Sequence, residues 1–356
     1  MSSRPLLFLP VTISALLIML TGCDSSKSDT SNSDQSQFES VKPTVDPNEV
    51  DEEEQAEAPL TANEMREALG ANENAQFDKA GRKFVMALLA NSGAKTLEPL
   101  KGQPLKVLDI SQTRITDLTP LKGMPLENIG MAETQVQDIS SLKGMPLKHL
   151  DGTRSEIEDL SPLEGMSQLT HVYLEGAKVK DISPLRLSPL KVVWLNECPI
   201  VDLSPLENMK LDELNLCDTS LQNLDTVKTM TLGTLWMRNT AVQELNPIAN
   251  HGLISLDVQG SAVKNLNALK EMVSLKRLNI AQTDVTDLSP LSGLSLNRLI
   301  FTPQKIEKGI EAVRNMTSLQ EIDTSFEGVS RPLSPSEFWE RYDAGEFKAE
   351  TEKFSN

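Results

Sequence analysis

The sequence DLTPLKGMP at residues 117–125 returns 21 positions later as DISSLKGMP at residues 138–146. The two copies share the opening Asp, the central Leu and the closing Lys-Gly-Met-Pro. Self-similarity at a fixed interval of about 20–50 residues is the signature of a repeat architecture. The interval therefore predicts stacked units that share one continuous core, in place of separate domains of ordinary size.

Ten units align on the leucine that opens a Leu-x-x-Leu-x-Leu pattern or a close variant of it. The spacing between these leucines is 21 residues, with two intervals of 22. They are Leu105, Leu126, Leu147, Leu169, Leu190, Leu211, Leu232, Leu253, Leu275 and Leu296. When this leucine is counted as position 1, apolar residues at positions 4 and 6 alternate as in a strand, and position 11 is apolar again. Each unit is therefore expected to open with a short strand.

The second half of several units reads Asp-Leu-Ser-Pro-Leu, as at residues 159–163, 202–206 and 287–291. Ser or Thr in this motif is expected to cap a helical turn that begins with Pro, where the missing N–H does no harm. Each unit would then consist of a strand, a bend, one turn of 3₁₀-like helix and a return. Because one unit buries too little apolar surface to offset the entropy of ordering it, the units must stack.

The pattern resembles the leucine-rich repeat, and the Ile-x-Asp-Leu-Ser-Pro-Leu half of the unit is similar to the internalin subclass. The resemblance covers residues 97–323. It implies an α/β repeat solenoid, a curved horseshoe with a parallel sheet on the concave side and 3₁₀ helices and turns on the convex side. At position 9, where internalins usually carry Asn, this chain carries Thr, Ser, Ala or Cys. A hydroxyl there can still satisfy nearby backbone groups, but Ala177 cannot, so no asparagine ladder is expected.

A helical cap is predicted at each end of the repeats. At the N-terminal end, residues 61–96, the stretch Thr61-Ala62-Asn63-Glu64 has the spacing of a capping box, and residues 76–90 are expected to continue the cap as a helix with an apolar face. The C-terminal end comprises residues 324–356.

In that C-terminal segment, Ser334-Pro335-Ser336-Glu337 reads as a second capping box. It is expected to open a helix over residues 336–343. The aromatic residues of this helix are predicted to cover the last repeat; they are Phe338, Trp339 and Tyr342.

Residues 1–22 read as an export signal. A single basic residue, Arg4, precedes an apolar run over residues 5–20 that is shorter than the roughly 20 residues needed to span a bilayer comfortably. The run ends in Leu20-Thr21-Gly22-Cys23, which resembles the lipobox of bacterial lipoproteins. That resemblance implies cleavage before Cys23, a lipid on its thiol, and a location in the bacterial cell envelope facing the periplasm or the exterior. An ordinary signal peptide with an incidental cysteine is the alternative.

Residues 23–60 are predicted to be a disordered tether. The chain carries 51 acidic and 34 basic residues, a net charge of −17, and residues 24–60 hold 11 of the acidic residues against two basic ones. Such a Ser, Asp and Glu-rich stretch cannot bury a core. The overall acidity also argues against nucleic acid as a partner.

The concave face is the predicted contact surface. There, side chains at positions 2, 3, 5, 7 and 8 point outward, and position 5 holds Tyr173, Trp194 and Trp236. Every Trp and Tyr outside the C-terminal cap lies in this one column, which core packing does not require. Exposed aromatic side chains are typical of contact surfaces, although these rings could instead merely cover one another across neighbouring strands. The flanking polar candidates are His149, His171, Glu175, Asn196 and Arg238.

The sequence offers little catalytic or metal chemistry. His149 and His171, with Asp151 and Glu175 nearby, could hold a transition metal, but histidines in a polar column are more often solvated, so neither a metal nor a cofactor is predicted. The G-x-S-x-G, H-E-x-x-H, P-loop and kinase motifs are missing from the sequence, so no enzyme is predicted.

The two cysteines of the repeats are expected to differ in exposure. Cys198, at position 9, should be buried, whereas Cys217, at position 7, should be partly exposed. Their different columns make a disulfide between them doubtful.

The leading interpretation is thus a lipid-anchored module that binds a protein or peptide through its concave face. Two alternatives remain open at this point: glycan or cell-wall recognition by the same rings, and a structural scaffold of the envelope without a dedicated ligand.

Overall fold

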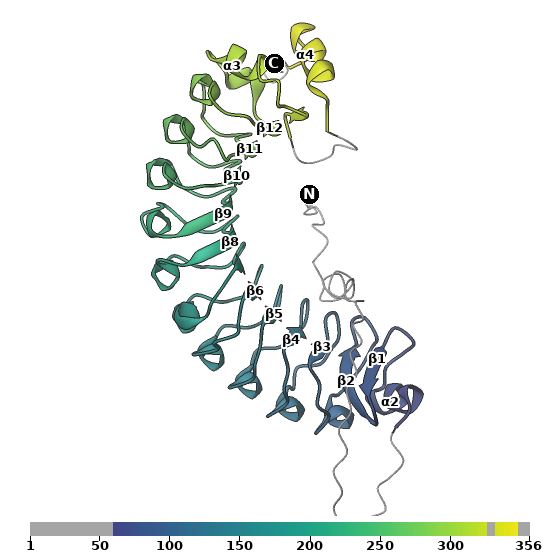
Figure 1. Ribbon diagram of the computed structural model, residues 1–356. Coiled ribbons are helices and arrows are strands. Elements are labelled where there is room, and N and C mark those ends of the chain that lie inside the picture. The colour runs from purple at the N-terminus through teal and green to yellow at the C-terminus, as the bar shows by residue number, and fades with distance from the viewer. Residues whose placement is uncertain (1–59, 326–331, 348–356) are drawn as a thin grey trace, which may run out of the picture.

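The protein is a curved solenoid (Figure 1). Its computed structural model describes residues 60–325 and 332–347. Thirteen strands form one sheet in sequence order from β1 to β13, and they line the inner side of the arc. All neighbouring strands from β2 onward pair in parallel. The predicted horseshoe with a parallel concave sheet is confirmed.

The repeat strands are short and pair in register at equivalent positions. Position 4 of each unit lies opposite position 4 of the next, as Leu108 lies opposite Ile129. The strands are β3 Val107–Asp109, β4 Asn128–Gly130, β5 His149–Asp151, β6 His171–Tyr173, β7 Val192–Trp194, β8 Lys210–Asn215, β9 Thr231–Trp236, β10 Ser255–Asp257, β11 Arg277–Asn279, β12 Arg298–Ile300 and β13 Glu321–Asp323. Every side chain therefore belongs to a column that runs across the sheet.

The convex side is built from single turns of 3₁₀ helix. These are η1 Glu98–Leu100, η2 Thr119–Leu121, η3 Ser140–Leu142, η4 Ser161–Leu163, η5 Ser183–Leu187, η6 Ser204–Leu206, η7 Val227–Thr229, η8 Asn246–Ile248, η9 Asn267–Leu269, η10 Ser289–Leu291 and η11 Pro303–Lys305, followed by the short α-helix α3 Ile310–Arg314. The leucines of the repeat point inward between the two sides and form one continuous hydrophobic core.

The capping of these turns differs from the prediction. In η4 the N-cap residue is Leu160, which makes no side-chain cap, and Ser161 is already the first helical residue. Asp159 Oδ1 accepts instead from the backbone N–H of Ser161, at 2.8 Å. This hydrogen bond lowers the pKa of Asp159. The turn begins one residue earlier than expected, so the Asp before the leucine, and not the Ser or Thr, satisfies the free N–H.

Hydroxyl groups replace the asparagine ladder, as the sequence suggested. At position 9 the Thr or Ser hydroxyl donates to the carbonyl of position 6 in the same unit, as from Thr134 to Met131 at 2.6 Å. The same bond is made by Thr113, Ser155, Thr219, Thr240 and Thr283. Cys198 donates its thiol to the carbonyl of Leu174, at 2.9 Å. These bonds hold the bends of the units that make them.

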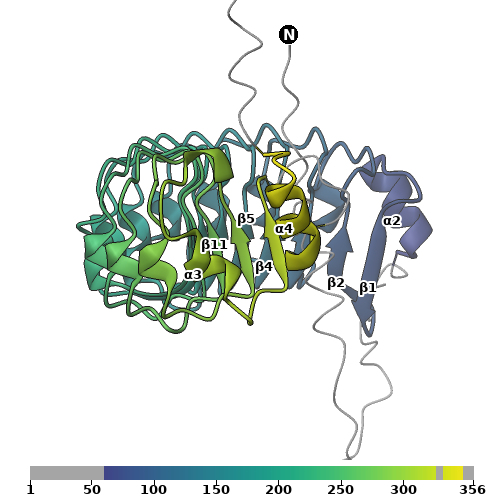
Figure 2. The same ribbon diagram turned by 90° about the horizontal axis from the view of Figure 1, so that it is seen from above.

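The N-terminal cap is only partly helical. Helix α2, Ala62–Leu69, begins with the predicted capping box between Thr61 and Glu64, and lies at the N-terminal end of the arc beside β1 (Figure 2). The prediction of a helix over residues 76–90 is wrong.

That stretch forms an antiparallel hairpin of β1, Gln76–Ala80, and β2, Lys83–Leu88. Gly81 supplies the positive φ of 62° that its two-residue turn requires. A strand is needed here because β3 presents an open edge that β2 pairs with, whereas a helix would leave its polar groups unpaired.

The C-terminal cap matches its prediction closely. Helix α4, Pro335–Asp343, begins one residue earlier than expected and carries the capping box between Ser334 and Glu337. Phe338 is fully buried, with its ring centroid 5.6 Å from that of Phe301. The end of the core is thereby closed.

The segment that the sequence predicts to be the anchor lies outside the part of the chain that the structure describes. The predicted signal peptide, Cys23 and the tether up to residue 59 lie outside the described residues. Within residues 60–325 and 332–347, no helix has both the length and the apolar character that crossing a membrane requires.

Candidate functional site

Five aromatic rings form a continuous row across the concave sheet, which we call the aromatic ridge. It consists of His149, His171, Tyr173, Trp194 and Trp236. The last three end strands β6, β7 and β9 in the position 5 column, and all five side chains are partly exposed. None of the three large rings belongs to the hydrophobic core of the described residues. The ridge therefore lies on the concave face of the sheet and outside the hydrophobic core, as predicted.

The rings of the ridge meet one another mostly edge to face. The centroid distances are 4.3 Å from His149 to His171, 5.1 Å from Tyr173 to Trp194 and 5.9 Å from Trp194 to Trp236, with interplanar angles of 76°, 84° and 65°. Mutual covering, the alternative left open by the sequence, is thus present. The rings nevertheless remain partly exposed, so packing among themselves does not use all of their surface.

The two tryptophans touch although a strand separates them. Asn215 lies between them in the column, but its Oδ1 accepts from the backbone N–H of Cys217, at 3.1 Å. This bond ties the Asn215 side chain to its own bend. The two indoles contact each other across β8, with their centroids 5.9 Å apart.

Glu213 is a further member of this surface that the sequence did not single out. It is partly exposed on β8, and its Oε2 lies 3.4 Å from the indole Nε1 of Trp194. Burial first, and then the charge of Glu213, raises the pKa of Tyr173 to about 12. The carboxylate therefore lies beside Trp194, and its charge acts on Tyr173. The only signal for it in the sequence was its place at position 3 of the strand between Trp194 and Trp236.

Burial disfavours the charged form of the two histidines at one end of the ridge. His149 Nδ1 contacts Asn128 Oδ1 and His171 Nδ1 lies 2.8 Å from Thr170 Oγ1. Burial, assisted by His171 and Lys148, lowers the pKa of His149 to about 4, and burial also lowers that of His171. Among the described residues, no cluster of three or more His, Cys, Asp or Glu side chains is placed to hold a metal ion.

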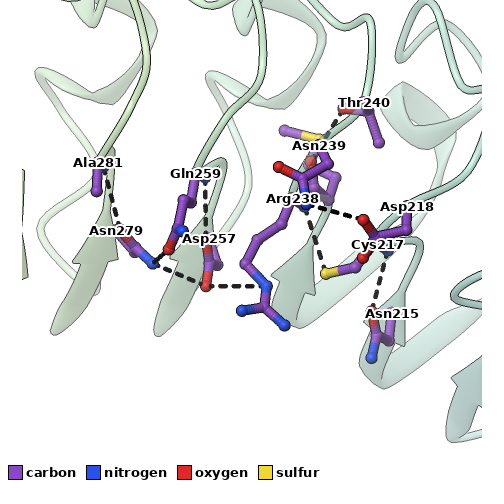
Figure 3. Close-up of polar contacts among 11 residues, drawn as sticks. Asn215, Cys217, Asp218, Arg238, Asn239, Thr240, Asp257, Gln259, Asn279 and Ala281 are labelled. Atoms are coloured by element: carbon purple, nitrogen blue, oxygen red, sulfur yellow. Dashed lines mark hydrogen bonds and ion pairs between the residues drawn. The ribbon is translucent and has the colours of Figure 1, made fainter. Parts of the chain in front are cut away.

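The other end of the ridge is bordered by a polar network (Figure 3). Arg238 Nε lies 3.9 Å from Asp257 Oδ2, which also accepts from Asn279 Nδ2 at 3.1 Å. Gln259 joins through its side chain, whose Oε1 accepts from Asn279 at 2.9 Å. Burial raises the pKa of Asp257 to about 6. The network directs the Arg238 guanidinium toward β10 (Figure 3).

The remaining predicted contact residues differ in accessibility. Glu175 accepts an ion-paired hydrogen bond from Arg154 Nη2, at 2.8 Å. Asn196 is only 7% exposed, so it offers a partner little surface.

Both repeat cysteines are buried. Cys198 is as predicted, but the expectation that Cys217 is partly exposed is wrong, since it is only 3% exposed. Its sulfur accepts from the backbone N–H of Arg238 at 3.3 Å, which holds the thiol against the neighbouring bend. Both thiols are free, and burial raises the pKa of each, to about 12 for Cys198 and about 11 for Cys217.

Comparisons with known proteins agree on the architecture. No protein-family model and no curated protein matches the sequence. Among solved structures, an internalin, InlF from Listeria monocytogenes, aligns with a TM-score of 0.55 and 21% identity over 74% of this chain and 89% of its own. The fold is the leucine-rich-repeat fold.

Two plant receptors also align with this chain. The ectodomain of the receptor kinase GASSHO1/SCHENGEN3 from Arabidopsis thaliana, solved with Casparian strip integrity factor 2, aligns with a TM-score of 0.50 and 16% identity. The alignment covers 70% of this chain and 39% of that one. The plant peptide hormone receptor RGFR1, in complex with RGF2, has a TM-score of 0.49 and 13% identity over 64% and 44% of the two chains.

Proposed function

We propose that this protein is a membrane-anchored leucine-rich-repeat lipoprotein that binds a protein or peptide through its aromatic ridge. The observation that carries the proposal is the ridge itself, a continuous row of rings on the concave sheet and outside the core. Large rings cost little side-chain entropy on binding and bury much area, which is why they dominate protein contacts. The role is one of binding, without catalysis.

The kind of partner follows from the ring geometry and the fold. Because the large rings meet at angles of 65° and 84°, they form a stepped surface. Such a surface favours a partner that inserts separate side chains between the rings. It is less suited to a sugar, which would stack on a shared flat platform. The GASSHO1/SCHENGEN3 ectodomain, solved with Casparian strip integrity factor 2, supports a protein or peptide partner for this fold.

The proposed anchor is a lipid on Cys23, at the end of the apolar run of residues 5–20. With the tether of residues 23–60, it would hold the solenoid in the bacterial cell envelope, facing the periplasm or the exterior. The tether supplies reach, since a flexible chain of this length spans about 35 Å on average.

The test uses residues 61–356, which contain both caps and every strand. This protein is immobilised and compared with Trp194→Ser/Trp236→Ser for capture of proteins from envelope fractions, identified by mass spectrometry. The matched control is Leu187→Ser/Val201→Ser, because both of those apolar residues are 70% exposed and lie outside the ridge.

We expect the tryptophan variant to lose at least about 90% of a specific captured protein and the control to retain it. Circular dichroism should show that both variants are folded. Equal capture by all three proteins would refute the role of the ridge. Loss of capture after glycan digestion of the fractions, but not after proteolysis, would favour the glycan alternative.

A further inference from the structure

A carboxylate set among partly exposed aromatic rings is an unusual surface, and Glu213 provides one. Its Oε2 is 3.4 Å from the Trp194 indole nitrogen, and its charge acts on Tyr173. Trp236 adjoins this pair through Trp194, with the two ring centroids 5.9 Å apart. This inference rests on the proposed function, because it concerns what the ridge recognises.

The faces of aromatic rings attract cations. In the two caps of this protein, basic side chains of the chain itself lie over such faces. Arg314 lies over the rings of Trp339 and Tyr342 in the C-terminal cap, with its guanidinium carbon 4.7 Å and 5.8 Å from their centroids. In the N-terminal cap, Lys79 lies over Phe84 at 4.4 Å. Within the described residues, no such cation is placed over Tyr173, Trp194 or Trp236.

A basic side chain that borders the ridge is already paired with a carboxylate on the next strand. Arg238 follows Trp236 by two residues, but its guanidinium is directed toward Asp257 on β10 (Figure 3). Asp212, beside Glu213 on the same strand, is exposed and adds a second negative charge. The solenoid as a whole is also acidic. Removing residues 1–60 leaves 51 − 11 = 40 acidic and 34 − 3 = 31 basic residues, a net charge of −9.

We infer that the surface formed by Tyr173, Trp194, Trp236 and Glu213 binds a Lys or Arg side chain of the partner. The ridge then binds a basic segment of a protein. The cation would lie against the ring faces and pair with the Glu213 carboxylate. The rings supply contact with the aliphatic stem, and the carboxylate supplies charge complementarity. Side chains on either side of the basic residue would lie along the rest of the ridge.

A short basic peptide tests this directly. Fluorescently labelled hexalysine is titrated with residues 61–356, and anisotropy is measured at about 0.15 M salt, where exposed charges more than about 8 Å apart are largely screened. The same peptide with acetylated lysines keeps its length but carries no side-chain ammonium charge.

The protein variant is Glu213→Gln, whose side-chain oxygen can still accept a hydrogen bond from Trp194. The control is Glu207→Gln, an exposed residue directly after η6, six positions before Glu213, that loses the same charge.

We expect hexalysine to bind at least about tenfold more weakly to Glu213→Gln than to the unmodified solenoid, and Glu207→Gln to change the affinity by less than about twofold. Acetylated peptide should not bind. Equal weakening by both variants would overturn the inference, because binding would then reflect overall acidity. Binding to phosphatidylcholine vesicles, with none to hexalysine, would overturn it in favour of a lipid cation.

The two proposals can fail separately. If Glu213→Gln still captures the envelope protein that Trp194→Ser/Trp236→Ser loses, the ridge is a binding surface but does not select a cation. If the tryptophan variant retains both the envelope protein and hexalysine, the ridge has neither role.

Discussion

Position 5 of the repeat carries Asp or Asn in five units, a large aromatic residue in three, and Gly130 and Ile300 in the other two. Asp and Asn side chains there accept a hydrogen bond from the backbone N–H of position 7, as Asp151 does from Thr153 at 3.0 Å and Asn279 from Ala281 at 3.1 Å. They tie the ends of these five strands to their bends. The aromatic residues of the same column cannot accept this bond, and that strand-to-bend link is absent at their units. The rings therefore do not serve this bond, which supports the contact role proposed for them.

Asp151 should make stability depend on pH. Burial first, with Asp109 and Glu175, raises its pKa from 3.8 to about 6. Because the folded state then binds a proton more tightly than the unfolded state, stability rises as pH falls from about 6 toward 4, and the charged carboxylate is a cost above pH 6.

We therefore expect Asp151→Asn to be more stable at pH 8, by on the order of 2 kcal/mol, with the difference shrinking toward pH 4. Asn215 and Asn279 show that an amide can keep the backbone bond at this position. Urea unfolding at both pH values measures the effect. A variant less stable than the parent at pH 8 would contradict the assignment.

In six units the bend after the strand is held by a local hydrogen bond from the position 9 hydroxyl, which the sequence indicated correctly. The hydroxyl at position 9 stands where internalins usually carry Asn. Two serines at this position allow a matched comparison. Ser155 donates to the carbonyl of Gly152 at 2.6 Å, whereas the buried hydroxyl of Ser261 has no hydrogen-bond partner among the described residues.

Removing these two hydroxyls should have different consequences. Ser155→Ala is expected to lower the free energy of unfolding by about 1 kcal/mol, since a buried hydrogen bond is lost. Ser261→Ala should leave it unchanged or raise it, because a buried group without a partner is removed. Chemical denaturation of both variants provides the measurement. A larger loss for Ser261→Ala than for Ser155→Ala would mean that the hydroxyls do not hold the bends.

Across the whole molecule, stacking turns short local patterns into one long surface. The ridge runs from β5 to β9, in the middle of the arc between the two caps (Figure 1). A partner that enters the concave side therefore meets the rings. The caps cover the two ends of the core and keep it from pairing with other chains.

The full chain is predicted to be attached to a membrane through a lipid on Cys23. Expressed in a bacterial host with a labelled fatty acid, the protein should incorporate the label, and Cys23→Ser should not, because only the thiol can form the thioether. Ser25→Ala, in the same stretch, keeps Cys23 and should be labelled normally. Absence of label from the unaltered chain would refute the lipoprotein assignment.

Periodicity by itself determined the repeat, its strands and core, and the column in which each aromatic residue lies. A fixed interval places equivalent residues on adjacent strands whatever their identity, so Tyr173, Trp194 and Trp236 could be assigned to one face from their numbers. The capping boxes were visible for a similar reason, since they involve residues only three positions apart.

Only the tertiary structure decided the features that depend on contacts between different units. The hairpin of β1 and β2 forms because β3 offers an open edge. Cys217 is buried by the next bend, and Glu213 lies among rings that neighbouring strands supply. Each of these outcomes depends on which way a side chain turns and on what the adjacent repeat places beside it. A linear pattern specifies the column of a residue but not the packing between columns.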